Sequence, residues 1–280
     1  MMTINNINFI FFLPIISLTL TILFYYFFEK IKSIVNIYDI SETEKRKIHS
    51  GNIPPIGGIT FYLIFIIYFL FNLFFKLEDN FFNSNKDLVV IMFTASAIFF
   101  IGLIDDKFTI SPANKSYLFI ITVTILILNS PELQIYFIRF TTLKTKYSLG
   151  DFTIFFTIFC VFCFMNAFNM YDGINLQSGL YIFLFFSVFF MKDIDSLFFI
   201  CLFIPLIFFL YKNYKNKIFL GNCGSYFLSY LISIYLIRSN IVYSKISVEE
   251  ILILLLVPGL DMLRLFMIRF AKGKNPFLPD

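Results

Sequence analysis

The chain has 280 residues, of which 59% are hydrophobic and only 14% are charged, and its mean hydropathy is +0.84. Soluble domains carry about 25% charged residues, so this composition excludes an ordinary soluble protein and indicates a polytopic membrane protein. The formal net charge of +4 follows from that topology and gives no argument for a nucleic-acid partner.

Apolar segments of membrane-spanning length recur along the whole chain. A spanning helix needs about 20 mostly apolar residues, and the candidate windows are 8–28, 56–75, 88–104, 117–130, 152–168, 177–191, 196–211, 224–238 and 250–268. We therefore expect an all-α transmembrane bundle of about nine helices, forming a single integral-membrane domain over residues 1–280. The sixth and seventh windows are short and separated only by KDIDS, which favours tilted or partly re-entrant helices.

The orientation follows from the loops. The first window is too long for a signal peptide and lacks a cleavage-site pattern, and the preceding MMTINNIN carries no positive charge. We expect a retained helix with its N-terminus outside. The loops that this places in the cytoplasm hold 14 Lys and Arg residues against 8 on the other side, as the positive-inside rule requires.

Five polar clusters interrupt the apolar pattern, and this topology puts all of them on the cytoplasmic side. Ionisable groups near membrane segments are costly and tend to be functional. In chain order the clusters are KRKIHSGNIPPIGG (45–58), DDKFTISPANK (105–115), NAFNMYDGINLQSG (166–179), FLGNCGS (219–225) and DMLRLFMIRFAKGKNPFLPD (261–280).

The first cluster contains the only histidine, His49, close to Lys45 and before a Pro-Pro-Ile-Gly-Gly run. One interpretation is a positively charged membrane flank with a Pro-Gly turn. The other is that Gly57 and Gly58 let a phosphate approach the backbone closely, with basic residues nearby.

The second cluster places Asp105 and Asp106 side by side at the end of an apolar window. Adjacent residues on a helix point about 100° apart, so two distinct roles are natural. One carboxylate could bind Mg²⁺, which favours one or two carboxylates plus substrate phosphates, and the other could position or deprotonate a substrate. The alternative is a solvated helix end, although the helix dipole disfavours anions there.

The third and fourth clusters are rich in amides and glycine. Asn166 and Asn169 are three residues apart and share a helix face, and Asp172 lies one further step along it. This polar stripe is either part of a site or hydrogen-bonding contact between helices. GNCGS is expected to form a Gly-rich turn between helices and is a weak signal by itself.

Taken together and in order, these motifs resemble the polyprenyl-phosphate N-acetylhexosamine-1-phosphate transferase family over roughly residues 9–280. GLIDDKF is similar to the family's Asp-Asp motif, NAFNMYDG to its Asn-Ala-Phe-Asn-x-x-Asp-Gly motif, and FLGN to its Phe-x-Gly-Asp motif. DMLRLFMIR followed by NPFLPD resembles the tail of the undecaprenyl-phosphate GlcNAc-1-phosphate transferase branch.

The resemblance implies an enzyme of the bacterial cytoplasmic membrane with its active site on the cytoplasmic face. It would transfer a HexNAc-1-phosphate from a UDP-HexNAc donor to a polyprenyl phosphate such as undecaprenyl phosphate, releasing UMP. This would be the first membrane step in making an envelope polysaccharide such as O-antigen. The implied cofactor is Mg²⁺, with Mn²⁺ as an alternative, and a second copy of the chain is a further candidate partner, as a homodimer.

The family pattern also implies roles for particular residues. Asp105 and Asp106 match the catalytic pair, and action as a base or as a nucleophile stays open between a one-step and a two-step route. Asp172 and Asn222 match metal-site positions. The expected substrate-binding residues are Lys45, His49, Gly57, Gly58, Lys115, Asn166, Asn169, Gly173, Asn175 and Arg264.

Three departures keep other functions open. Asn222 and Asn175 stand where the family pattern has Asp, and the sequence ends at NPFLPD, where the family continues into a His-rich loop and further helix. The alternatives are a truncated or degenerate non-catalytic homologue, and a membrane protein that binds or transports a lipid phosphate.

Overall fold

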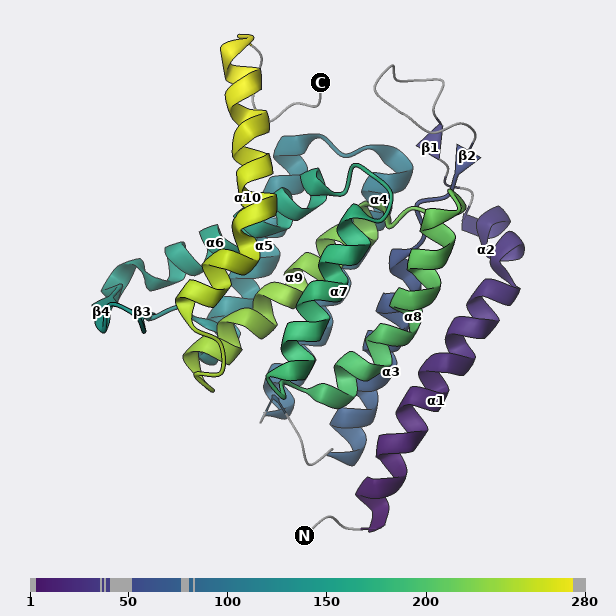
Figure 1. Cartoon of the computed structure of the whole chain (residues 1–280), viewed down its shortest axis with the longest axis horizontal. Coiled ribbons are helices and arrows are strands. Elements are labelled where there is room, and N and C mark those ends of the chain that lie inside the picture. Colours follow the sequence, from purple (N-terminus) through teal and green to yellow (C-terminus); the bar gives the residue numbers. More distant parts are fainter. Residues whose placement is uncertain are drawn as a thin grey trace.

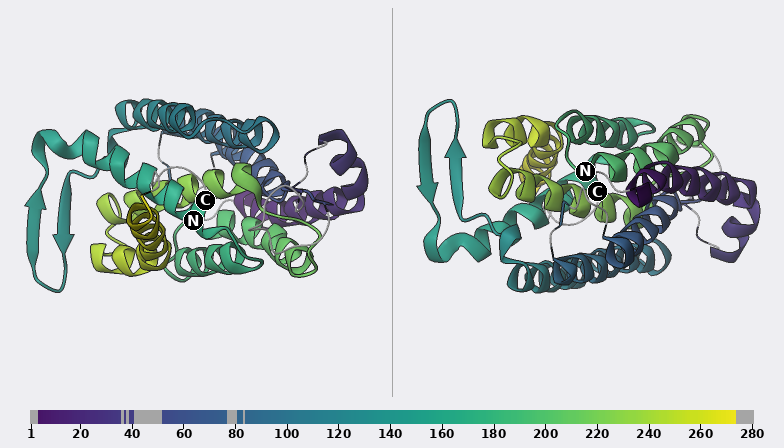
Figure 2. Two further views of the ribbon diagram at one scale, coloured as in Figure 1. Left: turned by 90° about the horizontal axis from the view of Figure 1, so that it is seen from above. Right: turned by 90° about the horizontal axis from the view of Figure 1, so that it is seen from below.

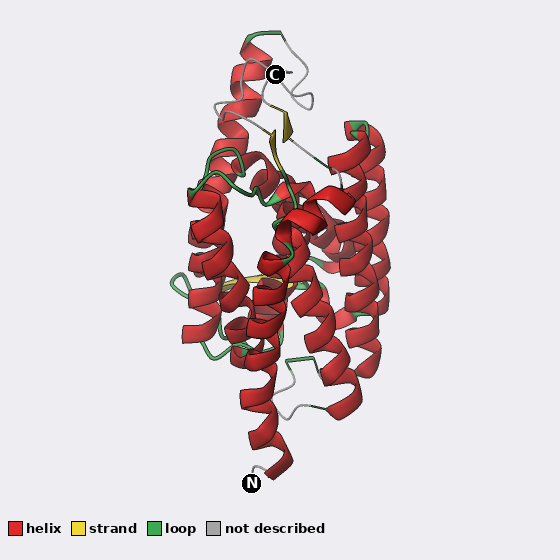
Figure 3. Ribbon diagram, turned by 90° about the vertical axis from the view of Figure 1, so that its right-hand side faces the viewer, coloured by secondary structure: helices red, strands yellow, loops and turns green. Residues whose placement is uncertain are grey.

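The computed structural model describes residues 4–35, 37, 39–40, 52–76, 81–82 and 84–273 (Figure 1). Helices make up most of this part of the chain, as the colouring in Figure 3 shows. They are α1 (Ile4–Tyr26), α2 (Phe28–Val35), α3 (Gly58–Phe75), α4 (Asn85–Phe108), α5 (Pro112–Asn129), α6 (Thr153–Tyr171), α7 (Gln177–Met191), α8 (Ser196–Tyr214), α9 (Gly221–Ile241) and α10 (Val248–Ala271).

The prediction of an all-α polytopic membrane protein is confirmed. Within the described residues, six helices are long and apolar enough to cross a membrane, or seven if α1 and α2, which meet at 70°, form one broken span. α7 has only 15 residues, as its short window predicted, whereas α8 reaches 19. The described helices number ten rather than about nine because the chain bends after α1 and begins the separate helix α2.

Two antiparallel hairpins were not predicted. β1 (Asp39–Ile40) pairs with β2 (Asn52–Ile53), and β3 (Phe137–Phe140) pairs with β4 (Thr145–Ser148). Figure 2 shows the second hairpin extending sideways from the bundle, away from α1 and α2. At its tip the Thr142 backbone N–H donates to Glu249 Oε1 at 2.8 Å, which fastens the hairpin to the start of α10.

Several helices extend further than the hydropathy windows, because a helix ends at a cap and not at the first charge. α4 continues through Asp105 and Asp106 to Phe108 and is capped by Thr109, whose N–H donates to the Asp105 carbonyl and whose left-handed backbone (φ 49°) ends the helix. α9 already begins at Gly221, so GNCGS is the first turn of a helix, and the expectation of a turn between helices was wrong.

α9 is the central helix of the bundle. Every residue from Cys223 to Ser239 is buried, and α3, α4 and α6 pack around it. Several of its polar side chains find partners inside the protein: Ser233 Oγ donates to the Ser229 carbonyl at 2.8 Å, and Tyr230 Oη donates to Thr94 Oγ1 at 2.7 Å. Hydrogen bonds of this kind lower the cost of burying serine and tyrosine side chains inside the bundle.

Glycines set how closely the neighbouring helices approach α9. A Cβ atom on Gly58 of α3 would lie 2.3 Å from Gly224 Cα, and one on Gly102 of α4 would lie 2.6 Å from Cys223 Cα. These contacts are with backbone atoms, which cannot rotate away. Both glycines bring their helices to the first turn of α9, where the polar residues gather.

We expect Gly58→Ala to destabilise the fold by about 1 to 3 kcal/mol, because the added methyl group forces two helix backbones apart. Thermal unfolding of the purified protein in detergent measures this. Gly259→Ala in α10 is the matched control, because a Cβ there meets nothing within 4 Å. Equal unfolding temperatures for the two variants would contradict this account of the α3–α9 contact.

Candidate active site

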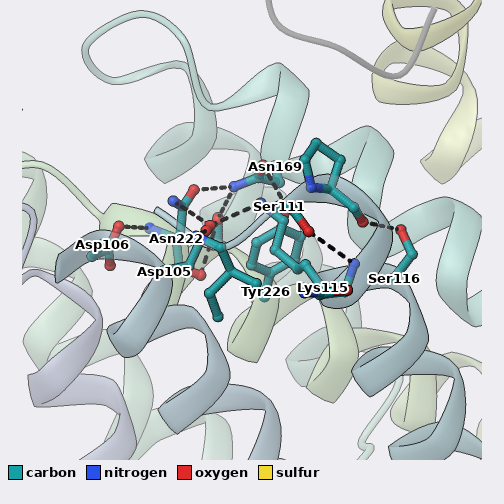
Figure 4. A network of polar contacts seen from close by, with 12 residues as sticks. Asp105, Asp106, Ser111, Lys115, Ser116, Asn169, Asn222 and Tyr226 are labelled. Atoms are coloured by element: carbon teal, nitrogen blue, oxygen red, sulfur yellow. Dashed lines mark hydrogen bonds and ion pairs between the residues drawn. The ribbon is translucent and has the colours of Figure 1, made fainter. Parts of the chain in front are cut away.

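The ends of four helices, which come from three separate parts of the sequence, meet at one end of the bundle (Figure 4). α4 ends there with Asp105 and Asp106, and the short connection that follows returns the chain so that Lys115 lies near the start of α5. α6 contributes Asn169 near its end, and α9 contributes Asn222 in its first turn. Direct hydrogen bonds join these side chains and backbone groups into one network.

Asp105 is buried, with 5% of its surface exposed, and both carboxylate oxygens accept hydrogen bonds. Oδ2 accepts from Lys115 Nζ at 2.8 Å and from Asn222 Nδ2 at 2.9 Å, while Oδ1 accepts from the Ile110 backbone N–H at 2.9 Å. The carbonyl end of α4 disfavours a negative charge, so the ammonium of Lys115 and the two N–H donors offset that cost.

Asp106 points in a different direction, toward the start of α9. Its Oδ1 accepts from the Asn222 backbone N–H at 2.9 Å and its Oδ2 from the Cys223 backbone N–H at 3.0 Å. The first N–H groups of a helix have no partner within the helix, and a negative charge near them is favourable. Asp106 therefore caps α9 from a neighbouring helix, a role that the sequence did not indicate.

Gly221 makes this cap sterically feasible. Its φ is +79°, a conformation that suits glycine. A Cβ atom there would lie 2.3 Å from the Pro55 carbonyl oxygen and 2.9 Å from Asp106 Oδ2. The backbone of α9 can approach both groups only because position 221 has no side chain.

Gly57 and Gly58 line the same junction from the other side. Their N–H groups donate to the carbonyls of Phe219 and Leu220 at 2.9 and 3.0 Å. A Cβ on Gly57 would lie 2.7 Å from the Phe209 ring. The close approach that these glycines permit is thus to protein backbone and side chains, and their contact with a substrate stays a prediction.

The two amides of Asn169 and Asn222 form the middle of the network. Asn169 Nδ2 donates to Asn222 Oδ1 at 2.8 Å and to Ser225 Oγ at 2.7 Å, and Asn169 Oδ1 accepts from Tyr226 Oη at 2.8 Å. Asn222 in turn uses its Nδ2 on Asp105. Every polar atom of the two amides therefore has a protein partner.

Asp172 lies just beyond α6 and is half-buried, with Ser178 Oγ donating a hydrogen bond to its Oδ1. Burial raises the pKa of Asp172 to about 6, and the bond from Ser178 opposes that shift. The turn after Asp172 is held by the end of α8 and the connection that follows it: the Leu176 N–H donates to Asn213 Oδ1 at 2.6 Å, and Asn175 Nδ2 donates to Asn216 Oδ1.

Other predicted residues make their described contacts outside the network. Asn166 Nδ2 donates to the Phe162 carbonyl of its own helix at 2.8 Å, although it was expected to share a face with Asn169. Gly173 is exposed, and Arg264 pairs with Asp261 on α10. Lys45 and His49 lie outside the described residues. Substrate contact by any of these stays a prediction.

The donor atoms can be compared with what Mg²⁺ requires. Within the described ranges, no group of three or more His, Cys, Asp and Glu side chains is placed to hold a metal ion. Mg²⁺ commonly uses one or two carboxylates together with phosphates and water, so the oxygens of Asp105, Asp106 and Asp172 suit it chemically. The Asn222 amide oxygen accepts a bond from Asn169, which metal ligation would have to replace.

Tyr226 and Ser225 were missed by sequence reasoning. They follow Asn222 by four and three residues, so all three share one face of α9 once that segment is a helix. The spacing was present in the sequence, but the expectation of a loop at GNCGS hid it.

The fold and this site define a polytopic membrane protein with carboxylates, amides and a lysine joined at one end of its helices. The family model of glycosyl transferase family 4 matches residues 88–240, which include all the network residues described above. The chain therefore belongs to glycosyl transferase family 4.

Curated relatives are similar in sequence to this protein over most of its length. The undecaprenyl-phosphate alpha-N-acetylglucosaminyl 1-phosphate transferase of Escherichia coli (strain K12) is 28% identical, covering 93% of this chain and 71% of the relative. The protein of the same name in Thermotoga maritima is 27% identical, covering 86% and 69%. That of Salmonella typhi is 25% identical, covering 89% and 68%.

We expect Gly221→Ala to destabilise the protein more than Gly150→Ala does. Both glycines have positive φ, +79° and +50°, but a Cβ at Gly150 meets nothing within 4 Å. The difference between the two variants isolates the contact of Gly221 with Pro55 and Asp106, worth about 1 to 3 kcal/mol beyond the shared backbone strain. Thermal unfolding measures both; equal losses would mean that the contact does not hold α9 in place.

The raised pKa of Asp172 predicts how stability depends on pH when EDTA keeps the protein free of metal ions. The folded protein favours the protonated carboxyl group of Asp172. The contribution of this group to the free energy of unfolding is therefore complete below about pH 4, the ordinary pKa of Asp, and is lost as the pH rises through about 6. Asp172→Asn cannot ionise, so its unfolding temperature relative to wild type should be higher at pH 7 than at pH 4. A difference independent of pH would contradict the raised pKa.

Proposed function

We propose that this protein transfers a HexNAc-1-phosphate from a UDP-HexNAc to undecaprenyl phosphate and releases UMP. The reaction would take place at the cytoplasmic face of a bacterial inner membrane and begin an envelope polysaccharide such as O-antigen. The observation that carries the proposal is the joined network of Asp105, Lys115, Asn169 and Asn222 in a family 4 chain. The activity by which the relatives are named supports the acceptor and the sugar class.

The chemistry of the network suits phosphoryl transfer. This reaction depends mainly on alignment and on neutralising phosphate charge. A lipid phosphate monoester has a second pKa of about 6 and is largely dianionic at pH 7, so a strong general base is not required. Lys115 places a positive charge 2.8 Å from Asp105 Oδ2 and is suited to meet an incoming phosphate oxygen.

The two aspartates would then act differently. Both oxygens of Asp106 accept N–H groups of α9, so this residue would fix the position of Asn222 and its neighbours. Asp105, Asp106 and Asp172 would supply oxygen ligands for Mg²⁺ or Mn²⁺ beside the diphosphate, with Asn222 as a further candidate. Bound Mg²⁺ would neutralise charge on the diphosphate. Asp105 would also hold Lys115 toward the substrate.

Release of UMP by purified protein tests the proposal, with Mg²⁺, undecaprenyl phosphate and a panel of UDP-HexNAc sugars. We expect Asp105→Asn to lower the rate by about 100-fold or more, because it removes the charge that orders Lys115. Asp151→Asn, an exposed carboxylate before α6, should stay within about twofold of wild type. No UMP release by folded wild-type protein with any donor would favour a non-catalytic homologue, and lipid-phosphate binding would then be measured.

A further inference from the structure

Tyr226 touches both ends of the network and has no role in the proposed function so far. It lies early in α9, is 2% exposed, and its ring packs against the Phe119 ring with centroids 4.6 Å apart. Its hydroxyl donates to Asn169 Oδ1 at 2.8 Å, and Lys115 Nζ lies 5.2 Å from the centroid of its ring. One buried side chain therefore contacts an amide of α6 and an ammonium of α5 (Figure 4).

The donors and acceptors of the network have a single consistent direction. An ionised carboxylate can only accept, so Asn222 must present its NH₂ group to Asp105 and its oxygen to Asn169. Asn169 must then present its own NH₂ group to Asn222, which turns its oxygen toward Tyr226. The tyrosine hydroxyl supplies the first donor of a chain that ends at Asp105, and hydrogen bonds in such chains strengthen one another.

This series of hydrogen bonds also explains what an asparagine achieves at position 222. A carboxylate there could neither donate to Asp105 nor complete the series, and it would add a like charge beside Asp105 and Asp106. The Asn222 amide instead accepts from Asn169 and donates to Asp105, in the direction that the Tyr226 hydroxyl sets. Lys115 contacts both ends of this series, because it pairs with Asp105 at 2.8 Å and lies beside the Tyr226 ring.

We propose that Tyr226 is a positioning residue, which orients the amides of Asn169 and Asn222 toward Asp105 and holds Lys115 beside them. The catalytic consequence rests on the proposed transferase function. The orientation of the two amides does not, so it can be tested separately.

Tyr226→Phe separates the hydroxyl from the ring, because it keeps the ring and removes the donor to Asn169 together with the polar interaction between that hydroxyl and Lys115. Tyr226→Leu removes the ring beside Lys115 as well. Tyr230→Phe is the matched control: it deletes the same hydroxyl one turn further along α9, where the partner is Thr94. Unfolding temperatures of all three variants establish that each is folded before activity is compared.

Steady-state UMP release measures the catalytic consequence. We expect Tyr226→Phe to lower kcat about tenfold with little change in KM for the UDP-sugar, and Tyr226→Leu to lower kcat further. Tyr230→Phe should stay within about twofold of wild type. In an Asn169→Ala background the acceptor is gone, so Tyr226→Phe should lower kcat clearly less than it does in wild type, whereas a purely structural effect would persist in full.

A direct observation of the amides is independent of activity. In NMR spectra of ¹⁵N-asparagine-labelled protein, the side-chain signals of Asn169 and Asn222 are assigned by their loss in the respective Ala variants. Tyr226→Phe should shift both signals and speed their hydrogen exchange, and Tyr230→Phe should leave them in place.

The outcomes distinguish the two proposals. If wild type releases UMP but Tyr226→Phe matches Tyr230→Phe in kcat, the positioning role is wrong and the transferase function stands. If folded wild type releases no UMP, the proposed function fails, and the amide signals decide on Tyr226 alone. Unchanged signals in Tyr226→Phe would overturn the proposed orientation.

Discussion

The arrangement of this protein depends on how the start of a fully enclosed helix satisfies its backbone N–H groups. α9 begins at Gly221 and is buried from Cys223 to Ser239, so the N–H groups of its first turn need acceptors from the protein. Asp106 supplies the missing acceptors from the end of α4, and Gly221 lets the two segments come close enough. Once that junction forms, the side chain of Asn222 is fixed beside Asp105, and the rest of the network can assemble around it.

Two adjacent aspartates at a helix carbonyl end would be unfavourable by themselves, and the structure resolves this by giving each a different positive partner. Asp105 meets the ammonium of Lys115, and Asp106 meets the amino end of α9. Both carboxylates are thus hydrogen-bonded at one end of the bundle. A site with ordered carboxylates, a lysine and amides is suited to a reaction in which phosphate charge must be aligned and neutralised.

Stability and chemistry are closely joined in this region. Gly58, Gly102 and Gly221 set the distances between backbones, and the residues of the proposed site lie on the helices that these glycines bring together. The same first turn of α9 contributes the capped N–H groups, Asn222 and Tyr226. Changes in packing are therefore expected to reach the site through the position of α9, and the matched glycine and tyrosine controls separate these effects.

The sequence by itself determined the membrane class, the approximate set of helices and the gathering of polar motifs on one side, because hydropathy and charge are local properties. It could not determine where helices end, since windows stop at the first charges while α4 continues to Phe108. Nor could it distinguish Asn166 from Asn169, which have the same local chemistry. Only the packing of α6 against α9 points Asn169 toward Asn222 and Tyr226, while Asn166 bonds its own helix. Contacts between segments that are far apart in the chain are decided by tertiary structure, because they depend on helix rotation and backbone distance.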